Sequence, residues 1–260
     1  MNTDTDQAPE LRVLVTAGAS GIGRVIAQSF AQTGARLHIC DIAEKALDDV
    51  AKTHPDWGVS RCDVSDESQV ARMFEQVSAT LGGLDVLINN AGIAGPTGGV
   101  EDITAKDWRR TVDINLNGQF YCANHAVPLL KQSQNASIIC ISSVAGRLGY
   151  AYRTPYAATK WAIIGLSKSL AIELGPSGIR VNALLPGIVE GPRIEQVITE
   201  RAQALGVPYG DMEQDYINKI SLRRMVRAQD VANQAVFLCS PMGVNISGQS
   251  ISICGNVEVL

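Results

Sequence analysis

Short apolar runs alternate with longer amphipathic stretches along most of the 260-residue chain. Runs rich in β-branched residues favour buried strands, and the gaps between them carry apolar residues at helical spacing, as in 22–34 and 229–240. The predicted strands are 11–16, 36–40, 58–62, 84–89, 136–142, 179–185 and 249–254. Strands that alternate with helices form a parallel sheet covered on both faces. The pattern therefore predicts a doubly wound, Rossmann-type α/β fold with about seven parallel strands in a single domain.

Two segments do not follow this alternation. Residues 1–10 are polar and acidic and lack the apolar core of a signal peptide, so we expect a loose N-terminal tail ahead of one catalytic domain over 11–260. The stretch 190–225 is polar, carries a partly helical pattern, and is longer than an ordinary connection between a strand and a helix. We predict that it forms a small helical lid over the substrate.

Charge and composition exclude several function classes. Lys plus Arg number 22 and Asp plus Glu number 26, and this net charge of −4 argues against binding to nucleic acid. No apolar run reaches the length that spans a bilayer, so no membrane partner is expected. The six cysteines are scattered without a CxxC pair, which indicates a reduced, cytoplasmic protein. The three histidines lie far apart in the sequence, so we expect no metal site.

A glycine-rich turn, TAGASGIG at residues 16–23, joins the first predicted strand to the first predicted helix. Glycines in such a turn let the backbone approach a ligand closely, and the helix N-terminus offers free N–H groups to a pyrophosphate. The same sequence would also suit a tight corner between a strand and a helix. We favour nucleotide binding because the turn follows the first strand of an α/β chain. The residues expected to contact the nucleotide are Gly18, Ser20, Gly21, Ile22 and Gly23.

Acidic residues follow the second and third predicted strands. Asp41 lies about twenty residues beyond the glycines, where a carboxylate accepts hydrogen bonds from the ribose hydroxyls of NAD and repels the additional phosphate of NADP. The alternative for Asp41 is a turn or helix-capping residue. Asp63 and Val64 are placed to contact the adenine, although Asp63 in a turn, with Ser65 or Asp66 capping the next helix, is equally compatible. The sequence therefore favours NAD as the cofactor.

Small residues and asparagines follow the fourth predicted strand in NNAGIAG, residues 89–95. Small residues allow a ligand to approach the backbone closely, and asparagine amides can connect the ends of strands. We therefore expect Asn90, Ala91 and Gly92 to lie against the cofactor.

A tyrosine and a lysine stand four residues apart in TPYAATKWA, residues 154–162. Helical residues at this spacing share one face, so the Lys160 ammonium can lie near the Tyr156 side chain. A free phenol, with a pKa of about 10, is a poor acid–base catalyst at neutral pH, but a neighbouring cation stabilises the phenolate and lowers that pKa. A drop of about three pKa units is worth roughly 4 kcal/mol. The pair is therefore either a tuned acid–base group or two residues that merely share a helix face.

Taken together and in this order, the motifs resemble those of the classical short-chain dehydrogenases/reductases. The likeness runs from about Leu11 to Asn256 and rests on TAGASGIG, Asp41, NNAG, SSVAG with Ser143 thirteen residues before Tyr156, YAATK, and PG after the sixth strand. Three positions depart from the family pattern: Ala17 replaces the usual first glycine, Gly191 a frequent threonine, and ICGN the common VDGG.

The resemblance implies that the protein interconverts a secondary alcohol and a ketone by hydride transfer, with Tyr156 as general acid or base. Ser143 would hydrogen-bond the substrate oxygen, Lys160 would also hold the nicotinamide ribose, and Asn115 would complete a proton relay. From the residues alone, Asn115 is better explained as a buried side chain that satisfies helix backbone groups, and Ser143 as a strand-end cap. The further cofactor contacts implied are Pro186, Gly187 and Val189, besides Tyr156 and Lys160. The family also implies a homo-oligomer, most often a tetramer.

The loops expected to face the substrate carry three arginines, Arg147, Arg153 and Arg193. Arginine forks match carboxylate, sulfonate or phosphate, so one or more of them could receive an anionic group. The alternatives are salt bridges with lid acids or with another subunit, or exposure to water. A neutral polyol or sugar is at least as compatible. We predict a small polar hydroxy compound as substrate: a sugar, a polyol or a hydroxy acid.

Other function classes fit the sequence less well. A dinucleotide-binding regulatory protein without turnover would be expected to lose Ser143, Tyr156 or Lys160, and all three are present. An epimerase or dehydratase of nucleotide sugars usually needs a longer C-terminal substrate domain. A 3-oxoacyl-type or other carbonyl reductase would use the same residues in the direction of reduction. We therefore predict an NAD-dependent oxidoreductase that acts on CH–OH groups.

Overall fold

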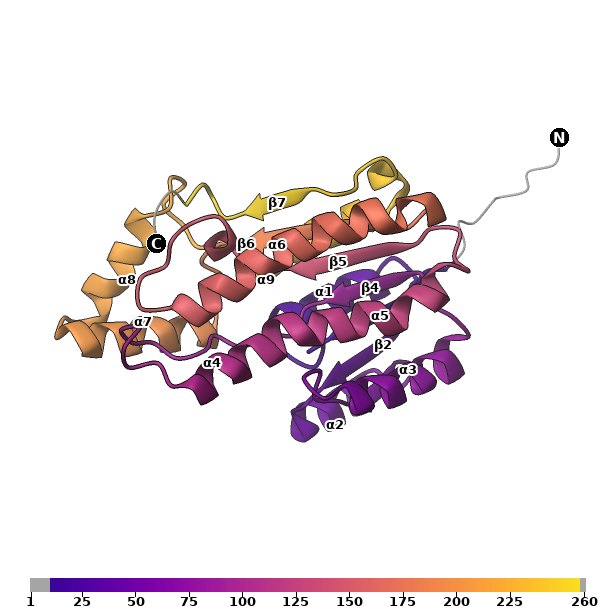
Figure 1. Cartoon of the computed structure of the whole chain (residues 1–260), viewed down its shortest axis with the longest axis horizontal. Helices are drawn as coiled ribbons and strands as arrows, with labels where there is room; N and C mark the ends of the chain where they lie inside the picture. The colour runs from indigo at the N-terminus through magenta and orange to yellow at the C-terminus, as the bar shows by residue number, and fades with distance from the viewer. Residues whose placement is uncertain (1–9, 258–260) are drawn as a thin grey trace.

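The computed structural model of the chain describes residues 10–257, which form one seven-stranded parallel sheet with helices on both faces (Figure 1). The strand order β3-β2-β1-β4-β5-β6-β7 confirms the predicted doubly wound, Rossmann-type single domain. The predicted loose tail falls, except for Glu10, outside the described residues. The strands are β1 (Arg12–Thr16), β2 (Arg36–Asp41), β3 (Gly58–Arg61), β4 (Val86–Asn89), β5 (Ser137–Ile141), β6 (Arg180–Pro186) and β7 (Ser250–Ile253).

The central strands explain why the apolar runs in the sequence are nearly continuous. Every residue of β4, β5 and β6 is buried, because helices cover both faces of the sheet. β1 pairs with β2 on one side and with β4 on the other, so the strand order reverses at β1. The connections after β1 and β4 leave in opposite directions at such a reversal, and a crevice remains outside the carboxyl ends of the strands. The fold thus places the loops selected from the sequence around one crevice.

Two layers of helices enclose the sheet. One layer consists of α3 (Glu67–Leu81), α5 (Gly118–Leu130) and α6 (Thr154–Leu174), and the opposite layer of α1 (Gly21–Ala31), α2 (Glu44–Thr53) and α9 (Ala228–Cys239). Neighbouring strand residues supply the two cores in turn: Leu14 packs in the first and Val15 in the second, as the two-residue period of a strand requires. Burying one such side chain stabilises the fold by about 1.5–3 kcal/mol. Within residues 10–257, no helix is long and apolar enough to cross a membrane.

A third, smaller apolar cluster lies at the carboxyl end of the sheet. It joins α7 (Pro192–Leu205) to α8 (Tyr209–Asn218) through Ile198, Met212 and Tyr216. Figure 1 shows these two helices at the end toward which the β5 and β7 arrows point. Both helices fall within 190–225, the stretch expected to be partly helical. They stand beside the crevice and supply one of its walls.

Candidate active site

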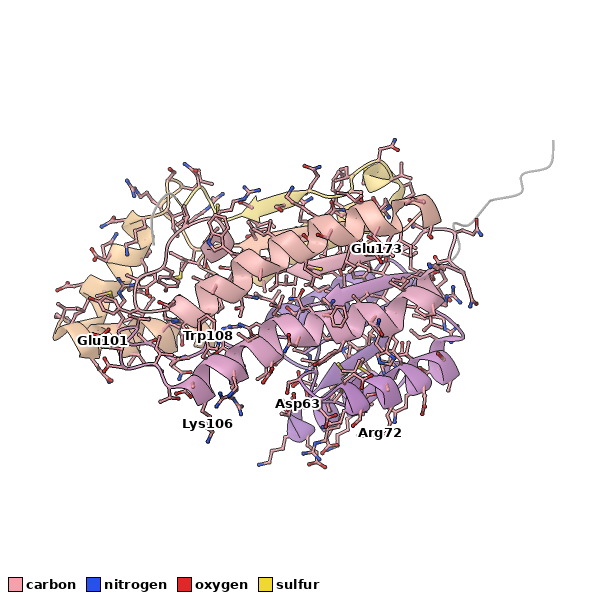
Figure 2. All side chains as sticks on the ribbon, viewed as in Figure 1. Asp63, Arg72, Glu101, Lys106, Trp108 and Glu173 are labelled. Carbon is pink, nitrogen blue, oxygen red and sulfur yellow. The ribbon has the colours of Figure 1, made fainter. Side chains whose placement is uncertain are left out.

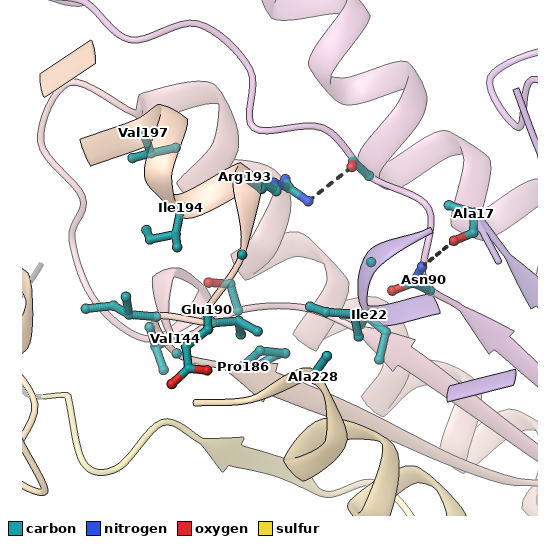
Figure 3. Close-up of a pocket in the computed structure, with 18 of the residues that line it drawn as sticks. Ala17, Ile22, Asn90, Val144, Pro186, Glu190, Arg193, Ile194, Val197 and Ala228 are labelled. Atoms are coloured by element: carbon teal, nitrogen blue, oxygen red, sulfur yellow. Dashed lines mark hydrogen bonds between the residues drawn. The ribbon is translucent and has the colours of Figure 1, made fainter. Parts of the chain in front are cut away.

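A cavity of about 820 Å³ opens at the carboxyl ends of β1, β4, β5 and β6, beside the start of α7 (Figure 3). This volume is within the range of about 300–1,000 Å³ that small-molecule sites occupy. Among the residues selected from the sequence, those that line it are Ser20, Gly21, Ile22, Asn90, Gly92, Ser143, Arg153, Tyr156, Lys160, Pro186, Gly187, Val189 and Arg193. Those that do not are Gly18, Gly23, Asp41, Asp63, Val64, Ala91, Asn115 and Arg147.

The glycine-rich turn is built by close backbone packing. Gly18 has no room for a side chain, because an added Cβ would stand 2.8 Å from Ile39. At Gly23 the added atom would stand 2.2 Å from the Ala17 carbonyl oxygen. Ala17, which replaces the family's first glycine, adopts a left-handed backbone with φ 49°, and Gly21 has φ 53°. A left-handed alanine costs about 1–2 kcal/mol, so the turn keeps its shape against a local strain.

Asn90 connects the turn after β1 to the loop after β4. Its Nδ2 donates to the carbonyl oxygens of Thr16 at 3.0 Å and Ala17 at 3.2 Å (Figure 3 shows the second bond). Ser20 is the N-cap of α1, but its side chain makes no capping hydrogen bond. The first N–H groups of α1 therefore have no side-chain cap at the cavity, and a helix N-terminus of this kind suits a pyrophosphate.

Asp41 lies beside the turn and ties it to the end of β2. Its carboxylate accepts hydrogen bonds from the backbone N–H of Ala19 at 3.2 Å and of Ala43 at 3.0 Å, and the residue is buried. Both hydrogen bonds are those expected if Asp41 is a turn residue. They also hold the carboxylate at the strand end where a ribose would lie in a doubly wound fold. A contact with ribose stays a prediction.

The acidic residues after β3 accept hydrogen bonds from nearby backbone N–H groups. Asp63 Oδ1 accepts from the Ser65 N–H at 3.0 Å and from the Ser65 hydroxyl at 2.7 Å. Asp66 caps α3 by accepting from the N–H groups of Ser68 and Gln69. The turn and cap interpretation is thus confirmed, while an adenine contact by Asp63 or Val64 remains untested.

Tyr156 and Lys160 lie one turn apart at the start of α6, which begins after the loop 147–153. The Lys160 ammonium is buried, donates to the Ile141 carbonyl oxygen at 2.9 Å, and stands 5.6 Å from the centroid of the Tyr156 ring. Ser142 and Ser143 take different partners. Ser142 donates to the Lys160 carbonyl oxygen at 2.7 Å and holds α6 on the sheet. The Ser143 hydroxyl accepts from the Ala145 N–H at 3.1 Å and hydrogen-bonds Tyr156.

Electrostatics at this position favour the phenolate. Burial alone would raise the pKa of Tyr156, but the positive charges of Lys160, Arg193 and Arg153 and the hydrogen bond from Ser143 outweigh it and lower that pKa. Burial also lowers the pKa of Lys160, to about 8, against the opposing attraction of the phenol. Perturbed pairs of this kind in a cavity are typical of acid–base sites.

Asn115 lies behind the cavity wall in a π-helical turn, Asp113–Asn117, between α4 (Ala105–Val112) and α5. Its amide clamps the loop after β4: Oδ1 accepts from the Ile93 N–H at 2.7 Å, and Nδ2 donates to the Ile93 carbonyl oxygen at 3.1 Å. It also donates to the Thr159 hydroxyl at 3.1 Å. The side chain is therefore wedged between that loop and α6. π-Helical turns of this kind frequently mark functional sites.

The structure places Arg153 and Arg193 at the cavity and Arg147 outside it. Arg153 is buried at the cavity wall, and Arg193 reaches across from α7 to the Gly92 carbonyl oxygen at 3.4 Å (Figure 3). Arg147 does not line the cavity; it donates to the Ser252 hydroxyl at 3.2 Å and to the Ser250 carbonyl oxygen on β7. The structure thus gives no support to a substrate contact by Arg147.

Sequence analysis missed Tyr216, which is buried in α8 and lines the cavity. Its hydroxyl stands 3.2 Å from that of Tyr150, in the loop before α6. Ile194 and Val197 of α7 add an apolar wall. The spacing of Met212, Tyr216 and Ile220 at every fourth position signals a buried helix face, but the sequence gives no sign of what that face covers. Among residues 10–257, no group of three or more His, Cys, Asp or Glu could hold a metal ion.

Comparison with known proteins agrees with this architecture. The family described as Enoyl-(Acyl carrier protein) reductase matches residues 16–256. A cis-4-hydroxycyclohexanecarboxylate dehydrogenase of Sinomonas cyclohexanicum is 34% identical, over 93% of this chain and 94% of that protein.

Two solved structures are similar throughout. An NAD⁺-bound xylitol dehydrogenase has a TM-score of 0.88 and 26% identity, covering 94% of this chain and 97% of that one. A variant of actinorhodin polyketide ketoreductase with NADPH has a TM-score of 0.91 and 28% identity, covering 95% of this chain and 97% of that one. Similar folds thus hold either nicotinamide cofactor.

Substituting Gly23 tests whether the glycine-rich turn binds the nucleotide. Gly23→Ala forces its new methyl group against the Ala17 carbonyl oxygen, and overpacking of this kind costs about 1–3 kcal/mol, so we expect affinity for NAD to fall by about tenfold or more. Titration calorimetry measures the affinity. Gly175→Ala is the control, since an added Cβ there has nothing within 4 Å. Equal affinities of the two variants would contradict the role of this turn.

Proposed function

The chain belongs to the classical short-chain dehydrogenases/reductases, and we propose that it is an NAD-dependent enzyme that interconverts a secondary alcohol and a ketone on a small polar hydroxy compound. The observation that carries the proposal is the half-buried phenol of Tyr156, which lines the cavity together with Lys160, Ser143 and two arginines. A phenol whose pKa is lowered in this way can take and return a proton more readily than a free phenol.

The residues around the cavity fit a nicotinamide dinucleotide. The open N-terminus of α1 and the close-packed glycine turn suit its pyrophosphate, and Gly92 leaves space beside Lys160, whose Nζ would be 3.5 Å from an added Cβ. We propose that Asn90, Gly92, Pro186, Gly187 and Val189 border the nicotinamide half. When bound, the cofactor accepts a hydride from the carbinol carbon or returns it to the carbonyl carbon.

Tyr156 takes up or donates the proton that accompanies the hydride transfer. In oxidation its phenolate takes the hydroxyl proton while the carbon–hydrogen bond breaks, and in reduction its hydroxyl donates a proton to the carbonyl oxygen. Lys160 keeps the phenolate form accessible, because its charge offsets the burial of the phenol. Ser143 hydrogen-bonds the substrate oxygen as charge develops on it. Asn115 does not line the cavity, but it hydrogen-bonds Ile93 in the loop after β4 and Thr159 in α6. We propose that these bonds hold the proton relay in place.

Asp41 supports NAD rather than NADP. Its carboxylate is fixed by two backbone N–H groups at the end of β2, where the additional phosphate of NADP would meet a negative charge. The similar structures include both an NAD⁺-bound and an NADPH-bound enzyme, so the preference rests on this residue.

The substrate end of the cavity supports a small, polar hydroxy compound. Tyr150 and Tyr216 offer hydroxyl groups, Ile194 and Val197 offer an apolar wall, and α7 and α8 are placed to act as the lid. The similarity to a hydroxycyclohexanecarboxylate dehydrogenase and to a xylitol dehydrogenase also favours a hydroxy acid or a polyol. A 3-oxoacyl-type or other carbonyl reductase is the alternative, since one of the similar solved structures is a polyketide ketoreductase.

The surface supports a homo-oligomer, for which a tetramer is our proposal. Phe120 on α5 and Trp161 and Ile172 on α6 are 50%, 52% and 81% exposed. Trp108 on α4 lies on the same side of the molecule as α5 and α6 in Figure 2. Large apolar side chains gathered on adjacent helices are typical of an interface between subunits.

The free thiols of the six cysteines support a reducing, cytoplasmic location.

Removing the phenol tests the catalytic proposal. We expect Tyr156→Phe to lower kcat for NAD-linked alcohol oxidation by about 10²–10⁴-fold, because the general base is lost. In the unmodified enzyme, kcat/KM for oxidation should rise with pH as Tyr156 deprotonates, and for ketone reduction it should fall. Tyr152→Phe is the control, since Tyr152 is 58% exposed and does not line the cavity. Full activity in Tyr156→Phe would overturn the proposed mechanism.

Neutralising Asp41 tests the cofactor preference. The isosteric Asp41→Asn change removes a repulsion that costs several kcal/mol, so the ratio of kcat/KM with NAD to that with NADP should fall by about tenfold or more. Asp63→Asn is the matched control. Asp63 is expected to approach the adenine, which NAD and NADP share, so this variant should leave the ratio unchanged. A preference for NADP in the unmodified enzyme would refute the assignment of Asp41.

A further inference from the structure

Arg153 presents a buried guanidinium with unused donors at the cavity wall. The residue is 4% exposed, and its Cζ lies 5.4 Å from the ring centroids of both Tyr150 and Tyr156. Its Nη2 donates to the Ala94 carbonyl oxygen at 2.8 Å. Its Nε is fully buried and has no hydrogen-bond partner among the described residues. A buried donor without a partner is costly, so a ligand that accepts from it would gain affinity.

Charges around Arg153 are not balanced by the protein. None of the ion pairs within residues 10–257 involves Arg153, Arg193 or Lys160. Arg153 also precedes the first turn of α6, and the positive end of a helix dipole disfavours a cation. A phenolate on Tyr156 would offset one of the three positive charges and leave the others. Burying an unpaired charge is strongly unfavourable, which points to an anion brought by the substrate.

Acids near the cavity do not fill this role. Glu190 lines the cavity, but its side chain is exposed and makes no ion pair with either arginine. Glu195, in the first turn of α7, is exposed as well. Arg193 is exposed and bonds only weakly to Gly92 at 3.4 Å, so it can turn toward a bound anion (Figure 3).

We propose that Arg153 anchors the carboxylate of a hydroxy-acid or oxo-acid substrate, with Arg193 of α7 as the second cation. This inference rests on the proposed function and names its substrate class. A planar guanidinium binds a planar carboxylate through parallel N–H···O bonds. Arg153 Cζ lies 5.4 Å from the ring centroids of Tyr150 and Tyr156, and its Nε–H has no partner among the described residues. The carboxylate then lies within a few bonds of the carbon that faces Tyr156.

Arg153 also acts on Tyr156, and the test has to separate the two effects. Its charge contributes to the lowered pKa of the Tyr156 phenol, so its removal should also slow the reaction of neutral alcohols. Recognition of a carboxylate is therefore measured as a preference between two ligands on the same protein. Folding defects affect both ligands and cancel in that ratio. Loss of Arg153 also keeps Tyr156 more protonated, which weakens repulsion of the carboxylate and so acts against the expected loss of preference.

The direct experiment is titration calorimetry with cyclohexanecarboxylate and its neutral isostere cyclohexanecarboxamide, on the full chain with and without NAD. We expect the carboxylate to bind at least about tenfold more tightly than the carboxamide. Arg153→Gln should remove that preference, and Arg153→Lys, which keeps the charge but loses the fork, should reduce it. Arg147→Gln is the matched control, because Arg147 lies outside the cavity, and it should leave the preference unchanged.

Each result decides the question without reference to turnover. Equal binding of the two ligands to the unmodified protein would overturn the inference even if the enzyme oxidises other alcohols. An unchanged preference in both Arg153 variants would overturn it as well. A carboxylate preference that depends on Arg153 would support the inference even if no alcohol were oxidised, in which case the proposed function alone would fail. With active enzyme, Arg153→Gln should raise KM for hydroxy acids by about tenfold or more and leave KM for neutral alcohols unchanged.

Discussion

The site depends on burying Lys160 beside the phenol of Tyr156 without a carboxylate to neutralise the ammonium. Removing an ammonium from water is expensive. Among the described residues 10–257, Lys160 donates to the Ile141 carbonyl oxygen at 2.9 Å and forms no ion pair with a carboxylate. The remaining stabilisation comes from negative charge on Tyr156, so each group favours the charged form of the other. Arg193 and Arg153, which also line the cavity, lower the pKa of the phenol as Lys160 does. The pKa of the phenol is thereby lowered from its ordinary value, which makes Tyr156 a better acid–base group than a free phenol.

The fold supplies the rigidity that this arrangement needs. α6 carries both residues and is fastened to β5 by the bond from Ser142 to the Lys160 carbonyl oxygen. Asn115 fastens the same helix to the loop after β4 through Thr159 and Ile93. The reversal of strand order at β1 leaves the crevice in which the turn before α1 and the start of α6 face one cavity. Cofactor and proton-transfer groups can therefore meet without any large rearrangement of the sheet.

Much of this arrangement was predictable from local sequence. All seven strands lie within two residues of their predicted bounds, because buried parallel strands read as apolar runs, and the four-residue spacing of Tyr156 and Lys160 fixes their shared helix face. Non-local features were not predictable. Arg147 and Arg153 stand in the same loop, yet only the packing of that loop turns one toward β7 and buries the other at the cavity. The π-helical turn at Asp113–Asn117 and the approach of Tyr216 to Tyr150 likewise depend on contacts between distant segments.

A pH titration of the Tyr156 phenol, followed by phenolate absorbance, tests the central claim most directly. The chain has six tyrosines, so the signal of Tyr156 is the difference between the unmodified protein and Tyr156→Phe. We predict that Tyr156 ionises below the pKa of about 10 of a free phenol, and that Lys160→Met, which removes the nearest cation, raises its pKa. A phenol that titrates at or above that ordinary value, or one whose titration is indifferent to Lys160→Met, would contradict the account.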